Sequence, residues 1–273
     1  MRPVSDALLQ LEKLSKRFDG IIASDGISFE VRQGELHALI GPNGAGKTTL
    51  IGQLTGEVAP DSGSIHFANR DITALPTHRR SLLGIARTFQ ITSLFLEFTA
   101  LDNVALAVQA HDGHSFRFWR NARRDPTLRN PALAALDHVG LAARANVIAS
   151  KLSHGEHRQL EIAMALVVEP RMLLLDEPLA GMGPGELDRM IKTLLELKRK
   201  HTILLVEHDM EAVFALADRI TVLVNGRVIA SGPPEAIRAN VEVRSSYLGD
   251  QSDRLSPLLC DGVQQREQNI DHG

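Results

Sequence analysis

The stretch Gly41-Pro42-Asn43-Gly44-Ala45-Gly46-Lys47-Thr48-Thr49 fits the pattern G-x-x-x-x-G-K-[ST] at every fixed position, a pattern typical of loops that bind nucleotide phosphates. Its glycines allow a tight turn whose backbone N–H groups point at the oxygens of an anion. All nine residues are candidate nucleotide ligands. We expect Lys47 to contact the β- and γ-phosphates and the Thr48 hydroxyl to coordinate Mg²⁺.

The sequence on either side of this loop supports the interpretation. Residues 36–40 are apolar except for His37 and predict a short buried strand, and residues 48–54 predict the helix that follows. An anion bound by the loop would then lie at a helix N-terminus, where free N–H groups and the helix dipole favour negative charge. This context argues against a glycine-rich turn that fits the pattern by chance.

Length and composition exclude several classes of protein. A chain of 273 residues fits one large or two modest domains, and its net charge of −3 argues against a protein that coats nucleic acid. The longest apolar runs, such as 162–168, are well short of the roughly 20 residues that a membrane-spanning helix needs. The single cysteine, Cys260, cannot form an internal disulfide, and no secretory signal is visible. We therefore expect a cytoplasmic protein.

The order of the predicted elements indicates an α/β protein. Residues 8–31 alternate apolar and polar, with turns at 19–20 and 25–26, which predicts short antiparallel strands. Residues 172–175 and 202–206 are apolar runs typical of parallel strands covered on both faces. Alternating strands and helices around a phosphate loop therefore predict an α/β nucleotide-binding core, interrupted by an inserted α-helical subdomain at about 91–152. We predict that the polar tail, 250–273, is disordered.

Two helices are predicted within the inserted region. Thr99 and Asp102 form a capping box for the first, and Asn130 caps a second that has Pro131 at its first position and Leu133 facing inward. A basic segment lies between them. We interpret this segment as a solvated surface rather than as a contact with lipid headgroups or an acidic partner loop. Its arginines are Arg117, Arg120, Arg123, Arg124 and Arg129.

Polar residues follow three of the predicted strands. In a parallel sheet the carboxyl ends of the strands meet at one edge, so Gln90, Asp176, Glu177 and His208 should gather near Lys47. We expect Asp176 to support Mg²⁺ and Glu177 to polarise a water for in-line attack on a γ-phosphate. Gln90 and His208 are uninformative alone.

Phe18 is a candidate of a different kind. An exposed aromatic ring before the loop would stack on a nucleotide base, whereas packing in the core is the equally weighted alternative.

The segment Ser153-His154-Gly155-Glu156 predicts a second anion site. It offers a serine hydroxyl, a flexible glycine and the start of a helix. One triphosphate rarely needs two such sites within one chain. We therefore predict that this segment closes on nucleotide held by another copy or a paralogue, in a head-to-tail dimer that encloses two nucleotides.

Taken together, these motifs resemble those of ABC-transporter ATPases. Residues 41–48 resemble the Walker A loop, Gln90 the Q-loop, 152–156 the signature, 172–177 the Walker B strand with its glutamate, and His208 the switch histidine. The resemblance covers residues 8–249 and implies a P-loop NTPase core of the RecA-like type, with an antiparallel β subdomain and an inserted α-helical subdomain at about 91–152. Four segments are closer still to the LivG-type ATPases of branched-chain amino acid importers: 87–90, 177–182, 207–210 and 247–249.

The resemblance implies an ATPase that uses ATP and Mg²⁺. Glu177 and His208 would be catalytic, and Gln90 would contact both nucleotide and metal. The partners it implies are a second ATPase subunit, identical or paralogous, a membrane permease bound through a groove near Gln90, and indirectly an external solute-binding protein. The chain would then sit on the inner face of the membrane. His154, Glu156 and Gly183 depart from the common family pattern, at positions that the resemblance assigns to contacts across the dimer.

Three alternatives stay open at this stage. An exporter ATPase of the lipopolysaccharide-transport kind has a similar cassette, and only its partner would distinguish it. Soluble ABC ATPases of translation or DNA repair usually carry two cassettes or a long coiled-coil insert, which this sequence lacks. A nucleotide sensor that never hydrolyses would have no need of Glu177 and His208.

Overall fold

The fold contains a six-stranded sheet with the order β10-β9-β3-β8-β7-β6. The computed structural model describes residues 6–88, 94–111 and 125–248. Five strands are parallel and β10 runs antiparallel at one edge. Their bounds are β3 (Leu36–Ile40), β6 (Ile85–Arg87), β7 (Met172–Asp176), β8 (Thr202–Val206), β9 (Arg219–Val224) and β10 (Arg227–Gly232). The predicted strand before the phosphate loop is confirmed.

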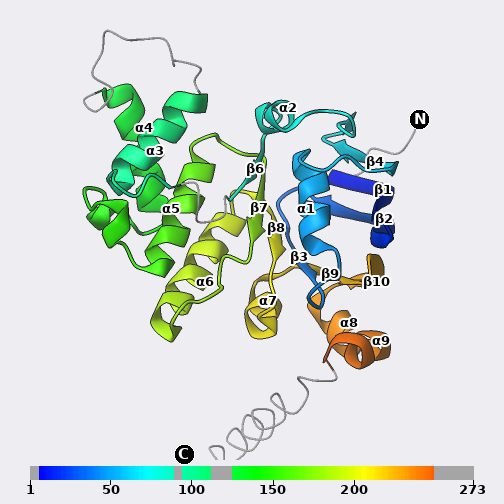
Figure 1. Cartoon of the computed structure of the whole chain (residues 1–273). Coiled ribbons are helices and arrows are strands. Elements are labelled where there is room, and N and C mark those ends of the chain that lie inside the picture. Colours follow the sequence, from blue (N-terminus) through cyan, green and yellow to red (C-terminus); the bar gives the residue numbers. More distant parts are fainter. Residues whose placement is uncertain (1–5, 89–93, 112–124, 249–273) are drawn as a thin grey trace, which may run out of the picture.

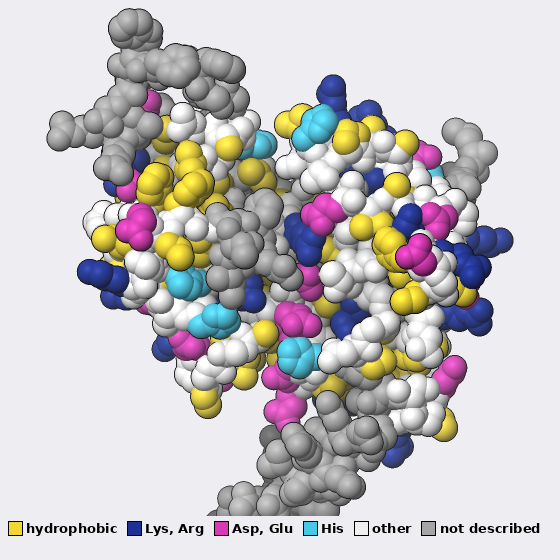
Figure 2. Space-filling model, in the orientation of Figure 1, with side chains coloured by type: hydrophobic (Ala, Val, Ile, Leu, Met, Phe, Trp, Pro, Cys, Tyr) yellow, Lys and Arg dark blue, Asp and Glu magenta, His cyan; other side chains and the backbone are white. Residues whose placement is uncertain are grey.

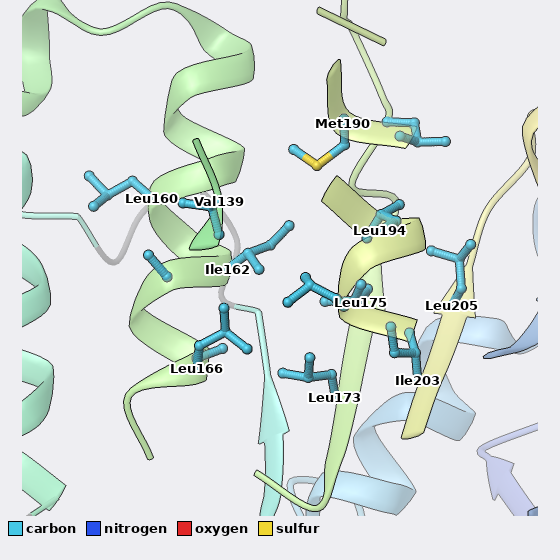
Figure 3. Packing of buried hydrophobic residues seen from close by; sticks show 14 of the residues in the cluster. Val139, Leu160, Ile162, Leu166, Leu173, Leu175, Met190, Leu194, Ile203 and Leu205 are labelled. Carbon is cyan, nitrogen blue, oxygen red and sulfur yellow. The ribbon is translucent and has the colours of Figure 1, made fainter. Parts of the chain in front are cut away.

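Both faces of this sheet are buried, which explains the unbroken apolar runs. In β7, Leu173 and Leu175 belong to one core cluster, whereas Met172 and Leu174 belong to a second cluster on the opposite face. Figure 3 shows side chains of α5 and α6 packed over β7 and β8 in the first cluster. Successive residues of a strand point to opposite faces, so a strand covered on both sides is apolar at nearly every position.

A second, antiparallel sheet has the order β2-β1-β4-β5. The strands β1 (Ala7–Phe18) and β2 (Ile21–Arg32) are joined by the predicted turn at 19–20, and β4 (Ser62–Phe67) pairs with β1 and with β5 (Arg70–Asp71). The turn predicted at 25–26 is wrong, because it lies inside β2. Gly26 has φ +65° there, and the pairing with β1 shifts register nearby, so the glycine marks a bulge rather than a chain reversal.

The helices lie at different places around the two sheets (Figure 1). α1 lies between the two sheets, since its buried residues join the core cluster that contains both. α3, α4 and α5 contact one another beside β6. The helices of the described residues are α1 (Lys47–Thr55), α2 (Thr77–Leu82), α3 (Ala100–His111), α4 (Pro126–His138), η3 (Ala142–Arg144), η4 (Ala149–Lys151), α5 (His154–Leu166), α6 (Pro184–Lys198), α7 (Met210–Leu216), α8 (Pro234–Ala239), α9 (Val241–Val243) and η5 (Arg244–Leu248). No helix in these described ranges is long and apolar enough to span a bilayer.

The start of α4 differs from the prediction. Asp125 caps the helix by accepting a hydrogen bond from Thr127 N–H, and Pro126 takes the first position. Pro131 therefore lies inside the helix, where it removes one backbone hydrogen bond without ending it. Leu133 is 40% exposed rather than inward. The Asp-Pro pair is the same start signal as Asn-Pro and comes one turn earlier.

The cap predicted for α3 is confirmed on one side. Thr99 Oγ1 accepts a hydrogen bond from Asp102 N–H at 3.1 Å, while the Asp102 carboxylate forms an ion pair with Arg129 of α4 at 3.0 Å. Arg129 thus joins two helices. The other arginines of the basic segment lie outside the described residues.

Arg80 binds the C-terminal end of α1, the helix that follows the phosphate loop. Arg80 as a whole is 2% exposed. Its guanidinium donates to the backbone oxygens of Gln53 (2.6 Å) and Leu54 (2.9 Å) in the last turn of α1, and to those of Leu75 (2.8 Å) and Thr73 (2.9 Å). Burial lowers the pKa of Arg80. Four directed donors from one planar group are a geometry that lysine cannot supply.

We therefore expect Arg80→Lys to lower the free energy of unfolding by about 1–2 kcal/mol, because at least one buried carbonyl loses its donor. Urea unfolding measures this directly. Arg79→Lys, one residue earlier on an exposed position of α2, is the matched control and should leave the midpoint unchanged. Equal midpoints for the two variants would contradict the role given to Arg80.

Candidate active site

The phosphate loop joins the end of β3 to the start of α1 and is enclosed by backbone. Gly46 caps α1 with φ +100°, and Gly41 has φ +156°. A Cβ at Gly41 would collide with the carbonyl of Leu223 in β9, and one at Gly46 with the carbonyl of Ala23 in β2. Only glycine fits at either position, so the motif glycines are required by close packing as well as by the turn.

Hydrogen bonds hold the loop in place from outside. Gly226, in the turn between β9 and β10, donates its N–H to the carbonyl of Ala45 at 2.9 Å, and its own carbonyl accepts from Asp25 N–H at 2.8 Å. The antiparallel sheet thus supports the phosphate loop through one glycine of a distant turn. This rigidity prepares the loop N–H groups for an anion.

The Lys47 ammonium lies in the centre of the site. It donates to the carbonyl oxygens of Gly41 at 2.6 Å and Pro42 at 3.0 Å, and the residue is 9% exposed. Burial lowers the pKa of Lys47, while the charges of Glu177 and Asp176 oppose that shift. The two carboxylates at the end of β7 therefore lie near this cation, as the sequence predicts.

Asp176 is held by Arg87 from the neighbouring strand. Arg87 Nη2 lies 3.1 Å from Asp176 Oδ2, and Arg87 Nη1 lies 2.9 Å from Glu57 Oε2. Arg87 is not among the site residues predicted from the sequence. Its position at the end of β6 is the only feature of the sequence that could have indicated a role in the site. The pairing of β6 with β7 is what places it beside Asp176.

Glu177 has a constrained backbone. Its φ is +49°, and its N–H donates to the carbonyl of Val206 at 2.9 Å. A non-glycine residue in the left-handed region costs of order 1–3 kcal/mol and is common at functional sites. The Glu177 side chain is 44% exposed, and its Oε1 lies 3.9 Å from Nδ1 of His208. The predicted base and the predicted switch histidine therefore face each other.

A buried glutamate connects the loops that carry these two residues. Glu207 is fully buried, and its carboxylate accepts hydrogen bonds from Leu179 N–H at 2.8 Å and His208 N–H at 3.1 Å. Burial raises the pKa of Glu207. Sequence reasoning missed this residue, since nothing in its spacing distinguishes it from an exposed glutamate after a strand.

Ser153 is exposed and caps α5. Its Oγ accepts from Glu156 N–H at 3.2 Å, and its own N–H donates to Glu156 Oε2 at 2.8 Å, which completes a capping box. Arg144 Nε lies 2.9 Å from Glu156 Oε1. The negative charge of Glu156, an unusual residue for this motif, is thus partly balanced by an arginine. His154 lies against Gly181 in the loop after β7.

The remaining predicted ligands lie at the edges of the site or outside the description. Phe18 is 45% exposed at the end of β1, with the Lys16 ammonium 5.3 Å from its ring centre. Core packing is therefore wrong for Phe18, and stacking on a base stays a prediction. Thr48 is exposed and Thr49 half-buried. Gln90 lies outside the described residues.

A metal would need more than protein ligands. Within the ranges that the structure describes, no three His, Cys, Asp or Glu side chains form a cluster able to hold a metal ion. Thr48 and Asp176 nevertheless supply the oxygen donors that Mg²⁺ prefers, and Mg²⁺ is usually bound by one or two such groups together with substrate phosphates. The residues present fit that arrangement.

A groove of about 550 Å³ lies next to this site, between α2 on one side and α3 and α5 on the other. Arg87 and Glu57 form its polar end, and exposed Leu82, Phe95 and Leu106 contribute apolar surface. Figure 2 shows charged and histidine side chains along the boundary between the helical lobe and the rest of the molecule.

The sheet topology, the glycine-lined phosphate loop and the carboxylates beside Lys47 define a P-loop NTPase. Comparisons with known proteins agree. The ABC transporter family matches residues 24–180, and a family described as branched-chain amino acid ATP-binding cassette transporter matches residues 227–253. The chain therefore belongs to the ABC transporter family.

Individual relatives cover almost the whole chain. The high-affinity branched-chain amino acid transport ATP-binding protein LivG of Salmonella typhimurium is 40% identical over 90% of this chain and 100% of its own length. The lipopolysaccharide export system ATP-binding protein LptB of Acidithiobacillus ferridurans is 37% identical over 89% of this chain and 98% of its own. A crystal structure of an ABC-transporter cassette in its ADP conformation is 31% identical, with a TM-score of 0.79, over 90% of this chain and 100% of that one. The resemblance inferred from the motifs is confirmed.

Proposed function

We propose that this chain is the ATP-hydrolysing subunit of an importer for branched-chain or related amino acids. The observation that carries the hydrolytic part is the group formed by Lys47, Asp176, Glu177 and His208 at one edge of the sheet, with Glu177 and His208 3.9 Å apart. The similarity to LivG and the match at residues 227–253 support the choice of solute.

Each residue has a distinct task in this proposal. The loop N–H groups and Lys47 bind the phosphates, and Glu177 takes a proton from the attacking water while His208 positions the γ-phosphate. Thr48, Asp176 and Gln90 would hold Mg²⁺, which neutralises charge on the phosphates. Arg87 keeps the Asp176 carboxylate in place through its ion pair.

The proposal also assigns partners. Ser153, exposed at the start of α5, contacts nucleotide held by a second ATPase subunit, identical or paralogous. A cytoplasmic loop of the permease occupies the groove between α2 and α3, whose apolar side chains need a cover. The complex places the chain on the inner face of the membrane and works with an external solute-binding protein. Nucleic acid has no part in it.

An exporter ATPase of the lipopolysaccharide-transport type is the weaker second candidate: LptB is 37% identical to this chain, against 40% for LivG, and residues 227–253 match the branched-chain amino acid family. The residues of the site contact nucleotide rather than cargo, so they do not separate the two.

The membrane partner decides between these functions. We expect the tagged chain, purified with gentle detergent, to bring down permease subunits whose reconstituted complex hydrolyses ATP faster with leucine and its binding protein. The Glu177→Gln complex is the control for ATPase contamination. Recovery of lipopolysaccharide-export components, or stimulation by lipopolysaccharide alone, would favour the exporter and contradict the importer.

A further inference from the structure

Glu186, in the first turn of α6, binds the serine of the signature segment. The carboxylate Oε1 accepts a hydrogen bond from Ser153 Oγ at 2.7 Å. A Cβ built on Gly155 would lie 2.9 Å from Glu186 Cδ, so the carboxyl group also lies directly against the start of α5. An anionic group of this chain therefore occupies the position where the proposed function places a phosphate.

Glu186 makes a shorter hydrogen bond to Ser153 than to the N-terminus of its own helix, α6. Glu186 Oε2 lies 3.4 Å from Gly183 N–H, the cap of α6, whereas its bond to Ser153 is 2.7 Å. Only the shorter distance lies within the usual range for a hydrogen bond. Gly183 stands where an aspartate is common in this family and has no side chain to cap α6. A purely capping role would bring Glu186 closer to Gly183.

Electrostatics keep this contact in place at neutral pH. The hydrogen bond from Ser153 is the main cause that lowers the pKa of Glu186, and the more distant Gly183 N–H adds to it, so the group stays ionised. A carboxylate and a phosphate compete for the same donors, because each offers negatively charged oxygens to a hydroxyl and a helix N-terminus.

We propose that Glu186 is an internal competitor for the signature serine: it binds Ser153 in the separate subunit and releases it when nucleotide on a neighbouring subunit arrives. This rests on the proposed function, in which Ser153 meets that nucleotide. Once released from Ser153, the Glu186 carboxylate has a second position available to it. A cavity of about 350 Å³ beside Ser153 and Glu186 is also lined by Arg189, whose positive charge attracts the carboxylate. The exchange raises the ATP concentration that dimer formation needs.

The test measures ATP-dependent dimerisation of the full chain in the hydrolysis-deficient Glu177→Gln background by sedimentation velocity. Adding Glu186→Gln should lower the ATP concentration for half-maximal dimer by roughly 2- to 12-fold, the worth of one typical hydrogen bond. Glu235→Gln, the same change in the first turn of α8, is the control and should change nothing. A second measurement follows the Glu186 carboxyl by NMR, where Ser153→Ala should raise its pKa.

The outcomes are separable. A dimer that forms at the same ATP concentration with and without Glu186→Gln would overturn the competition and leave the proposed function standing. A lower melting temperature without tighter dimerisation would reduce Glu186 to a helix cap. An unchanged pKa in Ser153→Ala would show that the contact is not made in solution. If Glu177→Gln forms no ATP-dependent dimer, alone or with permease, the proposed function fails and the competition with it.

Discussion

Replacing Glu177 with glutamine is expected to lower steady-state ATP hydrolysis by about 10²- to 10⁴-fold, the usual contribution of a general base. Glutamine keeps the size of the side chain but cannot take a proton from water. Nucleotide binding should persist, because Lys47 and the loop N–H groups are untouched. With binding intact and turnover stalled, ATP should trap the dimer. Phosphate release and size-exclusion chromatography with ATP measure the two effects.

The chain offers a matched control for this substitution. Glu169 also has a left-handed backbone, with φ +47° against +49° for Glu177, but it lies before β7, at the opposite end of that strand. Glu169→Gln should therefore preserve turnover while imposing the same backbone requirement on glutamine. Phosphate release by Glu177→Gln at the wild-type rate would remove Glu177 as the base.

The site was predictable where it depends on local chemistry. The loop positions that lie against the backbone of β2 and β9 accept only glycine. The spacing of these glycines is visible in the sequence without knowledge of what they contact. The same holds for Asp176 and Glu177, since an apolar run followed by two carboxylates marks the end of a buried parallel strand. Both predictions therefore followed from one segment each.

Residues that act across segments were not predictable in this way. Arg87 reaches Asp176 only because β6 and β7 are adjacent. Glu207 connects two loops 28 residues apart in sequence, and Glu186 reaches Ser153 across 33 residues. Each is an ordinary charged residue in sequence, and the fold alone supplies its partner. The predicted start of α4 was wrong for a related reason: two cap-and-proline signals compete in the sequence, and the buried Leu128 belongs only to the helix that begins at the earlier one.

Lys47→Ala is expected to weaken binding of a non-hydrolysable ATP analogue by about 10- to 150-fold, because a charge-assisted hydrogen bond to phosphate is worth roughly 1.5–3 kcal/mol. The structure sharpens this expectation. Burial lowers the pKa of Lys47, and the negative charges of Glu177 and Asp176 oppose that shift. Without the ammonium, those carboxylates would repel the phosphates as well. Isothermal titration calorimetry gives the affinity.

Loss of folding must be separated from loss of binding, since Lys47 also donates to the carbonyls of Gly41 and Pro42. A thermal melt without nucleotide measures that part, and Lys192→Ala, on an exposed position of α6, controls for the removal of one positive charge. We expect Lys192→Ala to bind the analogue as the wild type does. Lys47→Ala could also melt normally and bind the analogue as tightly as Lys192→Ala does. That result would show that the loop binds phosphate through its backbone N–H groups alone, with no contribution from the ammonium.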